Sequence, residues 1–184
     1  MEFHAIGMLE FISISAGIYS ADQMLKTAKV TLLEAHPICA GKYMVLIAGG
    51  VDEVTSAVKA GEDSVSSSFI VDSLVIPNIH KDIFPALSAS TFIQEIKALG
   101  SVETFTAASA IISADKALKA AKVRLMDLRL ANGMGGKSYF TLTGDIADVE
   151  AAMKEAEDEL KDKGLIVNTI IIPHPHEQLT KALL

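Results

Sequence analysis

The chain has 184 residues, half of them apolar, and its 16 basic against 23 acidic residues give a formal net charge of -7. This acidic balance without tryptophan argues against a nucleic-acid-binding protein, and no apolar run approaches the ~18 residues of a membrane span. A single cysteine excludes an internal disulfide, and the N-terminus lacks a signal-peptide pattern, so a cytoplasmic location is expected. The mean hydropathy of +0.37 predicts an oligomer interface.

An internal repeat divides the sequence. EFISISAGIYSADQMLKTAKVTL, residues 10–32, aligns without a gap on ETFTAASAIISADKALKAAKVRL, residues 103–125. Further along, GK at 41–42 aligns with GK at 136–137, and VIPNIH at 75–80 aligns with IIPHPH at 171–176. Self-similarity over such a span indicates two copies of one domain, and we predict domains at residues 1–92 and 93–184.

Each repeat predicts the same order of elements. In the first, we expect a strand at 6–14, a helix at 18–28, strands at 30–35 and 43–48, a second helix, a strand at 69–76 and a short helix from His80. In the second, we expect a strand at 101–106, a helix at 111–121, strands at 123–130 and 139–143, a helix capped by Asp145 and stopped by Gly164, a strand at 165–172 and a short helix from His176. The order β-α-β-β-α-β predicts an α+β fold of two tandem ferredoxin-like domains, each an antiparallel sheet with its helices on one face.

The stretch ANGMGGKS, residues 131–138, nearly matches the phosphate-loop pattern G-x-x-x-x-G-K-[ST]. That loop binds phosphate only where it leaves a strand and enters a helix. Here it leads into YFTLTG, which predicts a strand, so a glycine-rich hairpin turn is the better interpretation. A ferredoxin-like trimeric sensor that binds a nucleotide here remains an alternative of another class.

Several charged residues recur in both repeats without forming a catalytic set. The histidines of HPHE, at 174–177, sit where a strand is expected to turn into a helix, which favours a capping or interface role over metal binding. The recurring lysines on the first helix of each repeat indicate a repeated contact. We find no Ser/His/Asp set, Cys/His pair or paired carboxylate in corresponding loops, and we expect no enzymatic activity. The recurring lysines are Lys26 with Lys119 and Lys29 with Lys122.

The repeated motifs resemble those of bacterial microcompartment shell proteins. The resemblance is carried by SADQMLKTAKV and SADKALKAAKV, by CAGKY and GGKSYFTLTGD, and by VIPNIH and IIPHPHE, and it covers nearly the whole chain. It is closest to the unpermuted tandem-domain subclass, which implies a pseudohexameric homotrimer that tiles with other shell proteins into a shell within the cytoplasm. The assembly edge that we expect comprises Lys26, Lys29, Lys119, Lys122, His80 and His176.

The single cysteine, Cys39, falls at a functional position of one branch of this subclass. In the shell proteins associated with propanediol utilisation, one cysteine from each of three subunits holds a [4Fe-4S] cluster on the threefold axis. The resemblance therefore implies a metal-binding role for Cys39, and electron transfer across the shell to or from a redox enzyme, although Ala40 stands where that branch has proline. The implied pore loop comprises Ile38, Cys39, Ala40 and Gly41, with Gly133, Met134 and Gly135 of the second repeat contributing to the opening or plugging it.

Two other interpretations of Cys39 stay open. It could be a small apolar residue packed in the hairpin, or an exposed pore thiol without a role. In either case the trimer would be a metabolite pore without a cluster.

Overall fold

The computed structural model describes residues 3–183 and divides into two compact units, the first ending at Ile79 and the second beginning at His80. This division lies earlier than the boundary between residues 92 and 93 that the repeat suggested. The reason is helix α3 (Ile83–Leu87), the end of the first repeat, which packs on strand β6 (Arg124–Arg129) and helix α4 (Ala107–Ala120) of the second unit.

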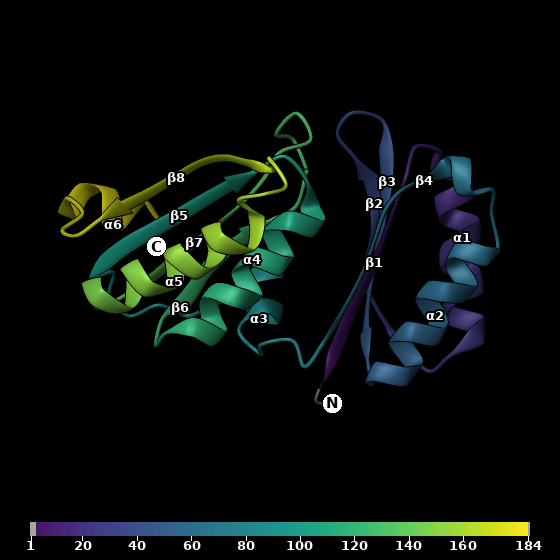
Figure 1. Cartoon of the computed structure of the whole chain (residues 1–184), viewed down its shortest axis with the longest axis horizontal. Coiled ribbons are helices and arrows are strands. Elements are labelled where there is room, and N and C mark those ends of the chain that lie inside the picture. The colour runs from purple at the N-terminus through teal and green to yellow at the C-terminus, as the bar shows by residue number, and fades with distance from the viewer. Residues whose placement is uncertain (1–2, 184) are drawn as a thin grey trace. The chain divides into compact units, whose positions relative to one another are not determined.

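The first unit is a four-stranded sheet with helices on one face (Figure 1). Its strand order is β2-β3-β1-β4, and every neighbouring pair is antiparallel. This is the predicted ferredoxin-like arrangement. Its elements are β1 (Ala5–Phe11), α1 (Ile14–Thr27), β2 (Thr31–Ile38), β3 (Lys42–Gly49), α2 (Val51–Asp63), a 3-10 turn (Ser67–Phe69) and β4 (Ile70–Pro77).

The second unit repeats this topology, with strand order β6-β7-β5-β8 and antiparallel neighbours throughout. Helices α4 and α5 pack together and against its sheet. Its remaining elements are β5 (Ala98–Thr104), β7 (Ser138–Gly144), α5 (Ile146–Leu160), β8 (Ile166–Ile172) and α6 (Glu177–Leu183).

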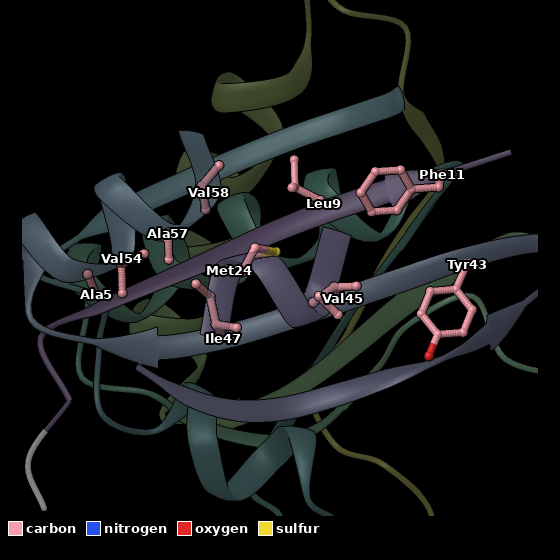
Figure 2. Close-up of a cluster of buried hydrophobic side chains, with 11 residues drawn as sticks. Ala5, Leu9, Phe11, Met24, Tyr43, Val45, Ile47, Val54, Ala57 and Val58 are labelled. Carbon is pink, nitrogen blue, oxygen red and sulfur yellow. The ribbon is translucent and has the colours of Figure 1, made fainter. Parts of the chain in front are cut away.

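The core of the first unit lies between its sheet and its helices. Leu9 and Phe11 alternate with Glu10 along β1 and point into the cluster that Figure 2 shows, together with Met24 of α1. Two glycines let the helices approach closely. A Cβ atom at Gly17 would lie 2.5 Å from a ring carbon of Tyr43, and one at Gly61 would lie 2.7 Å from the side chains of Leu9 and Met24. These contacts place α1 and α2 directly over the strands.

Three element ends differ from the sequence prediction. β1 ends at Phe11 because Ser13 caps α1, its hydroxyl accepting from the backbone N–H of Ala16 at 3.3 Å. Asp145 occupies the N-cap position of α5, but its carboxylate accepts from Lys97 Nζ at 2.7 Å and makes no capping bond. α5 ends at Leu160, ahead of Gly164, which has φ +63° in the following turn.

Within residues 3–183 we find no helix both long and apolar enough to cross a membrane.

Candidate functional site

The hairpin between β2 and β3 presents Cys39. The two strands pair up to Ile38 and Lys42, which leaves Cys39, Ala40 and Gly41 as a three-residue loop. Gly41 has φ +77°, the left-handed conformation that such loops require of their last residue, and the Cys39–Ala40 peptide bond is cis. Ile38 is buried and anchors the loop, Cys39 is half-buried, and Ala40 is exposed. The sulfur-bearing residue thus lies at the tip of a firmly paired hairpin.

His36 lies on β2 three residues before Cys39. Its Nδ1 is 3.0 Å from the carbonyl oxygen of Pro37, and its Nε2 is 2.8 Å from a carboxylate oxygen of Glu34. Burial lowers the pKa of His36, but the hydrogen bonds to Pro37 and Glu34 and the charge of Glu34 outweigh it, and the pKa is raised above 6.5. Both neighbours are acceptors, so the protonated ring can donate to both.

We expect His36 to make the protein more stable in mild acid. Because the pKa of His36 is raised in the folded state, its contribution is fully present below the unfolded pKa of about 6.5 and is lost as the pH rises through the folded value. In Glu34→Gln protein this pH dependence should weaken, because the charge that favours the imidazolium is gone. NMR titration of the His36 ring in both proteins measures this; an equal pKa in the two would show that Glu34 does not act on His36.

A buried ion pair supports the same hairpin. Lys42, the first residue of β3, pairs with Glu10 of β1, whose side chain is only 2% exposed. Asp72 of β4 lies opposite Glu10 in the register, and its pKa is raised by burial, although the N–H of Ser73 and the charge of Lys42 lower it. The second repeat has the equivalent pair, Lys137 with Glu103, at a more exposed position.

The corresponding loop of the second repeat contains no cysteine. Gly133 and Gly135 are exposed with positive φ, and the Met134 carbonyl accepts from the Lys137 N–H at 3.2 Å. The loop enters strand β7 at Ser138, which confirms the prediction that ANGMGGKS is a hairpin turn. Lys137 is bonded to Glu103, so its ammonium is held at the sheet and away from the loop backbone.

Most residues of the expected assembly edge are exposed. The four lysines 26, 29, 119 and 122 are exposed, and so is His176, whereas His80 is half-buried. The helices that carry Lys26 and Lys119 each contain an aspartate that the sequence prediction did not include in the edge. Asp22 pairs with Lys26 at 2.6 Å and Asp115 with Lys119 at 2.5 Å. Their recurrence at the same offset as the lysines was visible in the repeat alignment.

A metal site at Cys39 needs ligands beyond those that one described chain groups together. Within residues 3–183 there is no group of three or more His, Cys, Asp or Glu residues that could bind a metal ion. The loop nevertheless suits a shared site: the thiol is at a half-exposed tip, and a Cβ atom at Gly41 would meet nothing within 4 Å. Thiolates are the usual ligands of iron-sulfur clusters, so the donor chemistry fits a site to which each of several chains gives one ligand.

Comparison with known proteins identifies the domains. A model of the BMC domain matches residues 5–79 and again residues 98–175. The bacterial microcompartment shell protein PduT of Citrobacter freundii is 41% identical over 179 residues, which cover 97% of both chains. The carboxysome shell protein CcmK2 of Synechococcus elongatus is 34% identical over 82 residues, which is 43% of this chain and 80% of that protein.

A solved structure has the same fold over the whole chain. The crystal structure of a microcompartment protein from Desulfitobacterium hafniense DCB superposes with a TM-score of 0.92 at 44% identity, and the match covers 98% of this chain and 99% of that one. Both repeats are therefore shared with a relative of the same length.

Proposed function

The chain belongs to the BMC-domain family of bacterial microcompartment shell proteins, and from this premise we propose that three copies form a pseudohexameric disc in a microcompartment shell within the cytoplasm. At its centre, Cys39 of each copy supplies one ligand to a [4Fe-4S] cluster. The other proteins of the shell are its lateral partners, and a redox enzyme is the partner of the cluster.

The observation that carries the proposal is the position of Cys39. It stands at the tip of the β2–β3 hairpin, and the equivalent loop of the second repeat has glycines and Met134 instead. The thiol therefore occurs once for every two domains. In a ring of three chains, threefold symmetry would convert one cysteine into three ligands, which leaves one iron open to water, a small molecule or a group of another protein.

The residues of the hairpin have separate tasks in this proposal. Cys39 binds iron as the thiolate, and Ile38 and the Lys42–Glu10 pair hold the strand ends on either side of the loop. The bound cluster supplies one-electron transfer. Three thiolates near one axis repel each other, and iron binding offsets that repulsion, so cluster binding favours the trimer.

Exposed apolar side chains support association. Five of them lie on α1 or just before it, and they range from 40% to 57% exposed. Exposed apolar side chains that gather on one segment are typical of a protein-protein interface. Its members are Ile12, Ile14, Ile18, Tyr19 and Leu25.

Anaerobic purification followed by native mass spectrometry and iron and sulfide analysis tests the proposal. We expect a mass of three chains with about four iron and four sulfide per trimer. A trimer that contains no iron, even after anaerobic reconstitution, would favour the alternative of a metabolite pore without a cluster. A single chain would contradict the assembly itself.

A nucleotide-binding sensor is the less favoured candidate. It requires the loop at 131–138 to present backbone N–H groups and the Lys137 ammonium to phosphate, but the loop enters a strand and Lys137 pairs with Glu103. Phosphate-dependent thermal stabilisation that Lys137→Ala abolishes would revive this candidate.

A further inference from the structure

The end of the first repeat docks on the second unit through a defined contact. The backbone N–H of His80 donates to Asp115 Oδ1 of α4 at 2.8 Å, and Asp82 accepts from Arg124 Nε at 2.9 Å. In α3, Ile83 and Ala86 are completely buried. The strand-to-helix turn that follows β4 is therefore fixed by one hydrogen bond from a backbone N–H to a carboxylate, one ion pair and apolar packing.

The end of the second repeat has the same local structure without a docking partner. The His176 ring accepts from the Gln178 N–H at 3.2 Å, as the His80 ring accepts from the Asp82 N–H at 3.3 Å. Helix α6 has no buried residue, however. Leu179, which aligns with Ile83 when His176 is placed on His80, is 40% exposed. The α6 segment thus begins with the same histidine turn as the docked α3 segment and exposes the apolar Leu179.

The first repeat carries the matching receptor face. Asp22 of α1 aligns with Asp115, and Leu25 aligns with Leu118. Leu118 is 5% exposed, but Leu25 is 40% exposed. Among residues 3–183, the side chains that donate to Asp22 are Lys26 and Gln23, both at Oδ2. Asp22 Oδ1, the equivalent of the atom that binds the His80 N–H, is left available to a donor.

We propose that α6 of one copy docks on the α1–β2 face of the first repeat of a second copy, where the His176 backbone N–H donates to Asp22 Oδ1 and Leu179 and Leu25 become buried. The inference rests on the proposed trimer and specifies which surfaces join its chains. The two surfaces differ, so the contact is heterologous and propagates from copy to copy until a ring closes.

The contact between copies differs from the one within the chain in its charges. Asp82 and Arg124 form an ion pair, whereas the aligned residues of the second contact, Gln178 and Thr31, are neutral. Apolar burial and the hydrogen bond to Asp22 therefore carry the association. A docking interface of this composition is expected to depend weakly on salt.

Sedimentation velocity over a range of concentrations tests the contact with two variants at exposed positions and one control. Asp22→Ala removes the acceptor, and we expect it to raise the concentration of half-dissociation about tenfold or more. Leu179→Asp places a charge in an apolar contact, and we expect a rise of about a hundredfold. Gln23→Ala is the matched control, since it removes a neighbouring donor to Asp22 Oδ2 and keeps the acceptor, and we expect less than about a threefold change.

Hydrogen exchange supplies a second measurement that needs no variant. Amides of residues 176–183 should be protected in the trimer and lose protection on dilution to single chains. Protection that persists in single chains would mean that α6 docks on its own chain, which would overturn the inference. Trimers of unchanged stability in both Asp22→Ala and Leu179→Asp proteins would also overturn the proposed contact and leave the proposed function intact. A wild-type protein that never associates would contradict both the contact and the proposed function.

Discussion

Cys39→Ser protein purified without oxygen is expected to contain no iron or sulfide and to show no visible absorbance, whereas we expect about four iron atoms in each wild-type trimer. A serine hydroxyl is not deprotonated near neutral pH and is a hard oxygen donor, so it does not replace a thiolate ligand of a cluster. In the proposed trimer all three ligands come from the same position in three chains, so one substitution removes the whole set. The loss should therefore be complete.

Ala40→Ser is the matched control for this experiment. It introduces the same side chain at the adjacent exposed position of the same loop and leaves the thiol in place. We expect this variant to keep the iron and sulfide of the wild type. Iron and sulfide that persist in Cys39→Ser protein would contradict the ligand assignment, and their absence from all three proteins would leave the pore without a cluster as the better interpretation.

The sequence predicted the fold well because it contains the pattern twice. Helix α1 and helix α4 share a gapless alignment, and the apolar spacing is visible in both. The ends of the helices and strands were predicted less well. The prediction ran β1 on to residue 14 because Ile12 and Ile14 are apolar, but the hydrogen bond from the Ala16 N–H to Ser13 begins a helix there. A local capping bond outweighs strand propensity at such a boundary.

The candidate site at Cys39 was predictable only in part, because a single sequence shows local turns but not contacts with distant residues or other chains. That Cys39 lies in a hairpin turn follows from flanking apolar runs and Gly41, and the structure confirms it. The proposed role of Cys39 as a ligand requires other chains, because residues 3–183 of one chain contain no group of three or more His, Cys, Asp or Glu residues that could hold a metal ion. The division into compact units between Ile79 and His80 was not visible in the sequence either. No pattern in residues 80–92 tells that His80 is bonded to Asp115, a contact between distant parts of the sequence.

The largest effect on stability is expected for Lys42→Met. Its partner Glu10 is 2% exposed, so the substitution leaves a buried carboxylate without its cation. Loss of one member of a buried pair costs about 3–5 kcal/mol, because the remaining charge has neither water nor a counterion. Methionine retains most of the aliphatic stem, so lost packing is a minor part of the effect. Chemical denaturation at a fixed protein concentration measures the difference in the free energy of unfolding.

The repeat provides the control for this prediction. Lys137→Met breaks the equivalent pair, but the side chains of Lys137 and Glu103 are 44% and 34% exposed, so water replaces the lost cation and the cost should be about 1 kcal/mol or less. Equal losses in the two variants would show that burial of Glu10 is not the cause. The deficit of Lys42→Met should also shrink as the pH falls through the raised pKa of Asp72, because Lys42 lowers that pKa and protonation of Asp72 removes a second carboxylate charge that Lys42 offsets. The double variant Glu10→Gln/Lys42→Met should regain part of the free energy of unfolding that Lys42→Met loses, since a buried neutral amide needs no cation.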